Sequence, residues 1–274
     1  MKDSVFLELA KLITVQDLQT PLGPDVYFGE AISDAWERMM EACIDPPYDP
    51  IDRVSLVFNE NKVIGCTFLD YMDTDYEIIG TKGSFEQIEP DMIVAAEMKV
   101  FDLLDIIPDS GQFWYFVLKN NKIVGTIDKN DLFKLPFRLC LLALTLELEQ
   151  EILQLVMRNP SESWESMSSN RRQKIQGIFR NRYSVEPTDK NLGELLSCTS
   201  LSDKGVILRK TQKIGGWTKA EMKSVFNYVE DLRNACAHTN SEERIQKLLR
   251  SINFKRLVSE MLEIINAIQS LSFE

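Results

Sequence analysis

The apolar positions of the chain change their periodicity once, at about residue 138. Before that point short β-rich runs alternate with helical patterns, and two of the runs match at an offset of 60 residues. Residues 57–65 read VFNENKVIG and residues 117–125 read VLKNNKIVG. Each run has a β-rich segment, a polar turn around Asn-Lys and a second apolar segment that ends in Gly. This pattern predicts two β-hairpins.

Apolar residues at helical spacing precede both hairpins. They are Ala31, Ile32, Ala35, Trp36, Met39 and Met40 before the first, and Val94, Met98, Phe101 and Leu104, followed by Asp105, before the second. We therefore predict the order helix, strand, turn, strand, short helix twice, with copies at about residues 5–75 and 80–138. One small sheet cannot bury both of its faces, so the two copies should pack together.

After this repeat the pattern becomes helical. Residues 135–156 form an apolar, helix-favouring stretch that should stop at Pro160, with a core-facing stripe. The stripe consists of Phe137, Leu141, Leu144, Leu148, Ile152 and Leu155. Thr218 with Glu221 and Asn240 with Glu243 are capping boxes that should open the last two long helices. We predict an α+β protein with an α/β pair over residues 1–138 and an all-helical domain over residues 139–274.

Charge divides the chain at the same place. Residues 1–138 carry 12 Lys and Arg against 25 Asp and Glu, a net charge of −13, whereas residues 139–274 carry 19 against 17, a net charge of +2. The acidic half should repel nucleic acid, while the other half could tolerate a phosphate backbone. Five positive charges lie within residues 171–182, which could meet phosphates or form a solvated helix face.

Histidine and cysteine usage limits the chemistry. His238 is the only histidine, which excludes a metal site with several histidines, and we predict no metal. The five cysteines include no CxxC pair, which is typical of a reducing compartment. No signal peptide and no apolar run of about 20 residues is visible, so we expect a cytoplasmic protein that does not enter a membrane.

The repeated hairpins, the terminal Gly and the preceding helices resemble a tandem CBS-domain pair, also called a Bateman module, over roughly residues 5–138. That resemblance implies a site for an adenine nucleotide or another adenosyl ligand. The family's second strand commonly runs Gly, two apolar residues, Thr or Ser, two residues, then Asp, whose carboxylate holds the ribose. In the second copy Asp131 matches the ribose position and Asp128 replaces the phosphate-holding hydroxyl.

A carboxylate at Asp128 would repel a phosphate at short range. In the first copy Phe68 and Tyr71 fill the two ligand positions, so that copy has lost the pattern. The alternative is that this half is a dimerisation and scaffold unit, in which Asp131 caps a short helix.

One segment near the chain end combines residue types suited to RNA chemistry. Asn234 and His238 are four residues apart and share a helix face, and the long side chain of Arg233 could reach toward His238. Histidine can transfer a proton near neutral pH, and arginine can stabilise a phosphoryl transition state, so cleavage by a ribose 2′-OH would need no metal. The alternative is a histidine favoured by the dipole at a helix C-terminus.

Arg233, Asn234 and His238 resemble the hallmark of the HEPN superfamily, and the resemblance covers roughly residues 139–270. It implies a metal-independent ribonuclease that works as a homodimer, as in toxin and phage-defence systems, or a non-catalytic binding domain. Two hypotheses follow. The chain is either a ribonuclease regulated or dimerised by the CBS-like pair, or a non-catalytic module that senses a nucleotide or binds RNA or protein.

Overall fold

A computed structural model describes residues 5–41, 54–68, 78–79, 84–106, 114–128, 130–211, 214, 216–237 and 254–271. The chain forms two compact units. Residues 13–134 form the α/β unit, and residues 1–12 together with 135–274 form the helical unit. The chain therefore passes between the units twice, at Leu12–Ile13 and at Lys134–Leu135. The sheet-containing unit thus starts after the first helix, which sequence analysis had included in the first copy.

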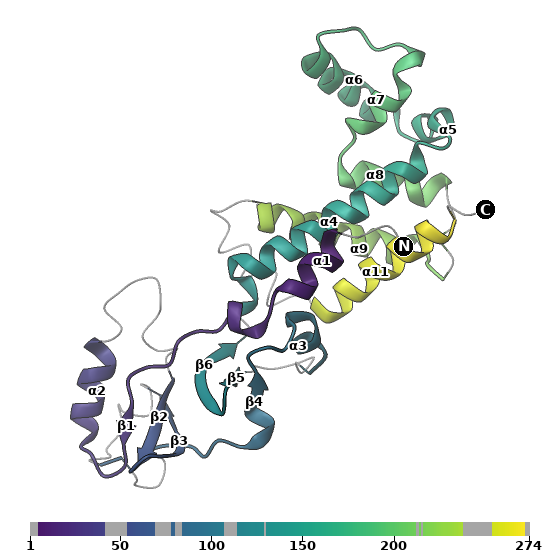
Figure 1. Ribbon diagram of the computed structural model, residues 1–274. Helices are drawn as coiled ribbons and strands as arrows, with labels where there is room; N and C mark the ends of the chain where they lie inside the picture. The colour runs from purple at the N-terminus through teal and green to yellow at the C-terminus, as the bar shows by residue number, and fades with distance from the viewer. Residues whose placement is uncertain are drawn as a thin grey trace. The chain divides into compact units, whose positions relative to one another are not determined.

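The α/β unit contains two three-stranded sheets of the same topology (Figure 1). The first has the order β1 (Val26–Tyr27), β2 (Val54–Asn59), β3 (Lys62–Phe68), and the second has the order β4 (Ile93–Ala95), β5 (Trp114–Lys119), β6 (Lys122–Asp128). In each sheet the first strand pairs parallel to the second, and the second pairs antiparallel to the third. Helices α2 (Ile32–Glu41) and α3 (Val100–Ile106) connect the parallel strands.

The predicted hairpins are confirmed, and their registers are identical at the offset of 60. Val57 pairs with Gly65 and Val117 pairs with Gly125, and each ladder has one irregularity directly after the pair. The turn of the second hairpin consists of Asn120, with φ of 49°, and Asn121, with φ of 60°. Asparagine tolerates this left-handed conformation, which matches the twist of the two flanking strands. The repeat is therefore structural, with register conserved between the two copies.

The two copies are joined by reciprocal strand pairing. Thr20, which precedes β1, exchanges two backbone hydrogen bonds of 2.7 and 2.9 Å with Thr126 of β6. Glu86, which precedes β4, exchanges two bonds of 2.8 Å with Cys66 of β3. Each copy thus contributes the segment before its first strand to the sheet of the other copy. This exchange joins the backbones of the two copies at two places.

The glycine that ends each match is required by this exchange. A Cβ on Gly125 would lie 2.7 Å from the carbonyl oxygen of Thr20, and one on Gly65 would overlap the carbonyl oxygen of Glu86. Both obstacles are backbone atoms, which cannot rotate away as a side chain can. Each match therefore ends in glycine because two chain segments cross too closely there to admit a Cβ.

Part of the helical prediction before the second hairpin is wrong. Val94 lies in strand β4, and α3 begins only at Val100. Val94 is buried, and an isolated apolar position does not distinguish a short strand from a helix start. The short parallel strands β1 and β4 were missed because two or three residues carry no detectable alternation.

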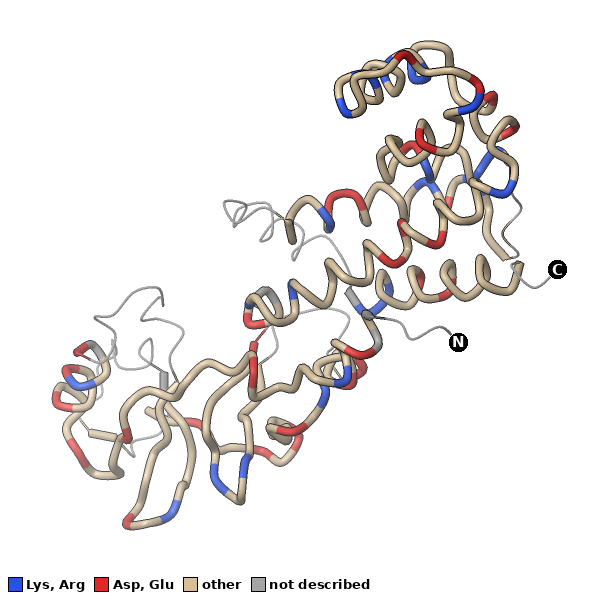
Figure 2. The backbone as a smooth tube through the Cα atoms, turned by 45° about the horizontal axis from the view of Figure 1, so that its top comes forward, with Lys and Arg blue, Asp and Glu red and all other residues tan. Residues whose placement is uncertain are grey.

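The helical unit is built around one long helix, α4 (Leu135–Val156). Helices α1 (Val5–Leu12), α8 (Leu201–Thr211), α9 (Lys219–Ala237) and α11 (Phe254–Ser270) all pack against α4. The predicted apolar stripe on α4 is confirmed, since every one of its six residues is buried. The basic segment becomes α6 (Ser169–Tyr183), and Figure 2 shows basic positions along it.

Shorter helices complete this unit. Helices α5 (Pro160–Glu165) and α7 (Leu192–Ser197) pack against each other, and α6 packs against α7. The capping box before α9 is confirmed, because Glu221 accepts a 2.8 Å bond from Thr218 N and Glu221 N donates to Thr218 Oγ1 at 3.2 Å. The second box, at Asn240 and Glu243, lies outside the described residues. Within the described ranges, no helix is both apolar enough and long enough to cross a bilayer.

Candidate functional site

The ribose position of the second copy is buried and held by the protein. Asp131 follows β6 in a short 3-10 helix, and the residue is 4% exposed. Its Oδ1 accepts a 2.7 Å hydrogen bond from Thr20 Oγ1, and its Oδ2 accepts a 2.8 Å bond from the backbone N–H of Asp128. The N-cap of the helix is Asn130, so Asp131 is not its cap. Its carboxylate instead joins the segment before β1 to the end of β6.

Asp128 lies beside Asp131, as the motif predicts. Its Oδ1 accepts bonds from the backbone N–H groups of Asn130 at 2.7 Å and of Asp131 at 3.0 Å. Asp128 therefore stabilises the turn after β6, which gives this carboxylate a local structural role. It still brings a negative charge to the place where the family pattern has a hydroxyl.

Lys134 binds the same region from the next turn. Its Nζ lies 2.7 Å from Asp131 Oδ1 and donates to the carbonyl oxygens of Leu18 at 2.6 Å and Gln19 at 3.1 Å, and to Thr20 Oγ1 at 3.0 Å. We call these contacts the Lys134 clasp. The clasp joins residues 18–20, close to the first crossing between the units, to the residue at the second crossing.

An adenosyl ligand would have to share this carboxylate. Asp131 already accepts from Thr20, Lys134 and Asp128, and a carboxylate offers about four acceptor positions. A ribose hydroxyl could reach Asp131 only if the Lys134 clasp opened, because Asp131 is almost wholly covered. The residue types fit a ribose, whereas the arrangement described is closed.

The second candidate site lies on α9. Arg233 and Asn234 are both half-buried and lie in the last turns of this helix, while His238 lies outside the described residues. The guanidinium of Arg138, from α4, donates to the carbonyl oxygens of Ala235 at 3.4 Å and Cys236 at 3.3 Å. Arg138 therefore satisfies carbonyls that the end of a helix leaves without partners.

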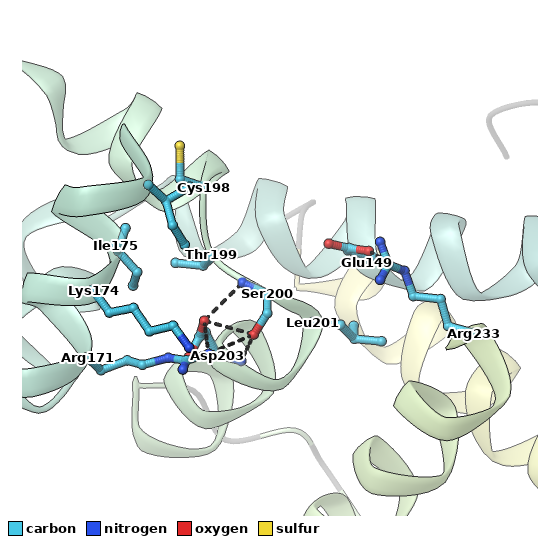
Figure 3. Close-up of a pocket in the computed structure, with 11 residues that line it drawn as sticks. Glu149, Arg171, Lys174, Ile175, Cys198, Thr199, Ser200, Leu201, Asp203 and Arg233 are labelled. Atoms are coloured by element: carbon cyan, nitrogen blue, oxygen red, sulfur yellow. Dashed lines mark hydrogen bonds and ion pairs between the residues drawn. The ribbon is translucent and has the colours of Figure 1, made fainter. Parts of the chain in front are cut away.

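A pocket of about 340 Å³ opens beside Arg233, between α4, α6, α8 and α9 (Figure 3). Its lining includes three cations and two carboxylates, together with polar and apolar groups. They are Arg171, Lys174, Arg233, Glu149, Asp203, Cys198, Thr199, Ser200, Ile175, Ile178 and Leu201. The basic helix predicted from sequence, α6, and Arg233 of the predicted motif thus line the same pocket.

One end of the pocket is held by a strong ion pair. Arg171 bonds both carboxylate oxygens of Asp203 and reaches Ser200 Oγ at 3.1 Å. Burial raises the pKa of the Asp203 carboxyl, but the hydrogen bonds from Arg171 and Ser200 outweigh burial and hold that pKa below its ordinary value. Asp203 is therefore ionised at neutral pH, and its charge is matched by Arg171.

At the other end Glu149 lies between two cations. The buried Lys204 donates to Glu149 Oε1 at 2.8 Å and to the Thr199 carbonyl at 2.6 Å. Arg233 Nε is 3.6 Å from Glu149 Oε2, too far for a hydrogen bond. Arg233 thus contributes positive charge to the pocket, and it forms no hydrogen bond with Glu149.

Sequence reasoning missed Thr20, Lys134 and Glu149. The i,i+3 spacing of Asp131 and Lys134 is a usable signal, because side chains three residues apart are neighbours on a helical turn. Thr20 is 111 residues from Asp131, and nothing in its neighbourhood points to that contact. Among the described side chains, no group of three His, Cys, Asp or Glu residues could hold a metal ion.

Comparisons with known proteins gave distant structural likenesses. No protein-family model matches the chain, and no curated protein matches it. The CBS domain of a bacterial CNNM/CorC-family Mg²⁺ transporter in complex with ATP is 13% identical, with a TM-score of 0.35, over 48% of this chain and 92% of that one. The CBS domain of a membrane protein from Sphaerobacter thermophilus is 14% identical, with a TM-score of 0.35, over 47% of this chain and 92% of that one.

Protein MJ1004 from Methanocaldococcus jannaschii is similar over more of the chain. It is 12% identical, with a TM-score of 0.34, over 89% of this chain and 99% of that one. None of these three structures is described as a HEPN protein. The predicted fold class, two CBS-like α/β units followed by a helical region, is confirmed, and its detail rests on the strand topology and reciprocal pairing described above.

Proposed function

We propose that the chain is a non-catalytic regulatory protein whose α/β unit senses an adenosyl ligand at Asp131. The observation that supports this proposal is the Lys134 clasp. Both chain crossings to the helical unit lie within a few residues of the clasp, at Leu12–Ile13 and Lys134–Leu135. A ligand that competes for Asp131 therefore acts on both connections at once.

The chemistry favours a ligand without phosphate at this position. A ribose 2′- or 3′-hydroxyl donates to Asp131 and replaces the Lys134 ammonium there. The Asp128 carboxylate repels a phosphate close to it. Adenosine, or an adenosyl compound with a neutral or cationic substituent, should therefore bind more tightly than ATP.

Calorimetric titration of the full chain with adenosine and with ATP tests this proposal. Wild-type protein should bind adenosine, and ATP should bind at least about tenfold more weakly. Asp131→Asn removes the charged acceptor and should weaken adenosine binding by about tenfold or more, as expected for one charged hydrogen bond. Asp91→Asn, which changes an exposed carboxylate outside the motif, is the matched control. Absence of any adenosine binding, or equal binding by Asp131→Asn, rejects the site.

RNA cleavage by Arg233, Asn234 and His238 is the second candidate. The observation that favours it is the pocket that places Arg233 near the basic residues Arg171 and Lys174. A homodimer would supply two copies of the motif, as the HEPN resemblance implies. Wild-type protein, Arg233→Ala and His238→Ala should be compared on mixed RNA with EDTA present. Cleavage by the wild type alone supports this candidate, and no cleavage by the wild type removes it.

A further inference from the structure

The pocket beside Arg233 has a charge balance that points to a ligand whether or not the chain cleaves RNA. It has two ion pairs, and Figure 3 draws their carboxylates, Asp203 and Glu149, at opposite sides with Leu201 between them. Asp203 is paired with Arg171, and Glu149 is paired with the buried Lys204 at 2.8 Å. Each carboxylate of the lining is therefore already matched by one cation.

Two cations of the pocket remain in excess of these pairs. Lys174 is exposed, and within the part of the chain that the structure describes its ammonium has no hydrogen-bond or ion-pair partner. Arg233 is 41% exposed and its 3.6 Å contact with Glu149 is not a hydrogen bond. The lining has three cations against two carboxylates, and Glu230 of α9 also acts on Arg171, so the pocket has a modest positive excess that attracts an anionic ligand.

The positions of the arginines suit phosphate oxygens. Arg171 uses its Nε and one terminal nitrogen for Asp203 and Ser200, which leaves its other terminal nitrogen for a ligand. Figure 3 shows Lys174 and Arg171 extending side by side from α6 toward Asp203. A phosphate monoester carries a charge of about −1.5 to −2 at neutral pH and three acceptor oxygens, which matches these donors.

The remaining lining fits an organic group. Ile175, Ile178 and Leu201 supply apolar surface, and the cavity of about 340 Å³ is at the small end of the range for organic ligands. A lone inorganic ion would leave this surface unused, and a nucleic-acid strand would enter only by its end. We propose that this pocket binds the phosphate monoester of a small organic molecule of mononucleotide class, with Lys174 and Arg171 at the phosphate and Arg233 at the other side of the cavity.

Calorimetric titration of the full chain with uridine 5′-monophosphate tests the proposal, and the Asp131→Asn variant separates this site from the ribose site proposed for the α/β unit. In Asp131→Asn, uridine, which lacks the phosphate, should not bind. Lys174→Ala should weaken binding by at least about tenfold, the loss expected for one charged hydrogen bond, and Arg233→Ala should weaken it less. Lys223→Ala removes the same charge from an exposed position on α9 outside the pocket and should bind as the wild type does. Asp131→Asn should also leave this affinity unchanged.

A second comparison distinguishes a free mononucleotide from an RNA end. A short RNA with a 5′-phosphate should compete with uridine 5′-monophosphate only if the pocket admits a strand end, and the same RNA with a 5′-hydroxyl should not compete. Either result for the phosphorylated RNA supports the phosphate site when uridine 5′-monophosphate binds. Three results would overturn it. They are absence of uridine 5′-monophosphate binding, wild-type affinity in both Lys174→Ala and Arg233→Ala, and equal competition by both RNAs.

Discussion

Lys134 Nζ lies 2.7 Å from Oδ1 of Asp131, so the ammonium occupies an acceptor that a ribose hydroxyl would need. Lys134→Ala should therefore have opposite effects on stability and on binding. The free energy of unfolding of the α/β unit should fall by about 1–3 kcal/mol, because a buried carboxylate loses a charged partner. Adenosine affinity should rise, because the ligand no longer displaces the lysine.

Hydrogen exchange of the β5 and β6 amides measures the first effect, with α4 amides as the reference in the same sample. Titration calorimetry measures the second. Lys122→Ala, in the exposed turn between β5 and β6, is the control and should change neither quantity. A variant that lost both stability and affinity would indicate that Lys134 only supports the fold.

Gly125→Ala and Gly65→Ala should each destabilise the α/β unit by about 2 kcal/mol or more. The new Cβ meets the carbonyl of Thr20 or of Glu86, and the strand crossing must open to admit it. Gly177→Ala is the matched control, because Gly177 lies in α6 with open space around its Cβ position. That change should be neutral or stabilise the helix by up to about 1 kcal/mol. Thermal unfolding with hydrogen exchange of each sheet measures all three.

Asp203 should make the helical unit sensitive to acid. Its carboxyl pKa is lower in the folded chain than in the unfolded chain, so the folded state binds that proton less readily. The stabilisation is complete above about pH 4 and is lost as the pH falls below that value through the folded pKa. Asp203→Asn should cost about 1–2 kcal/mol at pH 7. Melting curves of both proteins should converge as the pH falls below about 4, and a difference that stayed constant would contradict this role.

Thiol labelling should separate the described cysteines. Burial raises the pKa of the Cys66 thiol to about 12 and those of Cys140 and Cys236 to about 11, so little thiolate exists at pH 8. Cys198 is half-buried in the lining of the pocket. Iodoacetamide at pH 8, followed by peptide mass spectrometry, should modify Cys198 first among these four. Labelling in urea provides the reference rates, and faster reaction of Cys66 than of Cys198 would contradict the burial described.

The sequence predicted the elements whose signal is local and repeated. The hairpins could be recognised because the match at an offset of 60 includes the turn residues. Helix α4 could be recognised because its stripe extends from Phe137 to Leu155, about five turns. Strands β1 and β4 are too short to show alternation. The reciprocal pairing of Thr20 with Thr126 joins segments more than 100 residues apart, and no local pattern encodes it.

For the candidate sites, too, the sequence predicted individual residues but not the contacts that the fold creates between them. Asp131 and Asp128 were predicted from the resemblance to the CBS pattern that starts at Gly125, but the bonding of Asp131 to Thr20 and Lys134 depends on the fold. Arg233 was predicted from its distance to His238, and the structure adds its place in a pocket with residues of α6 and α8. Those partners come from helices that are adjacent only after packing. The RNA-cleavage role of this segment stays a prediction.

Hydrogen exchange of the full chain with and without adenosine tests the central claim most directly. The account predicts that adenosine changes exchange in peptides covering residues 15–20 and 130–137, because the ligand opens the Lys134 clasp at both connections to the helical unit. Asp131→Asn should show no such change at the same adenosine concentration. Exchange that stayed constant in both peptides while adenosine was bound, or that changed equally in Asp131→Asn, would contradict the proposal that Asp131 is the sensing site.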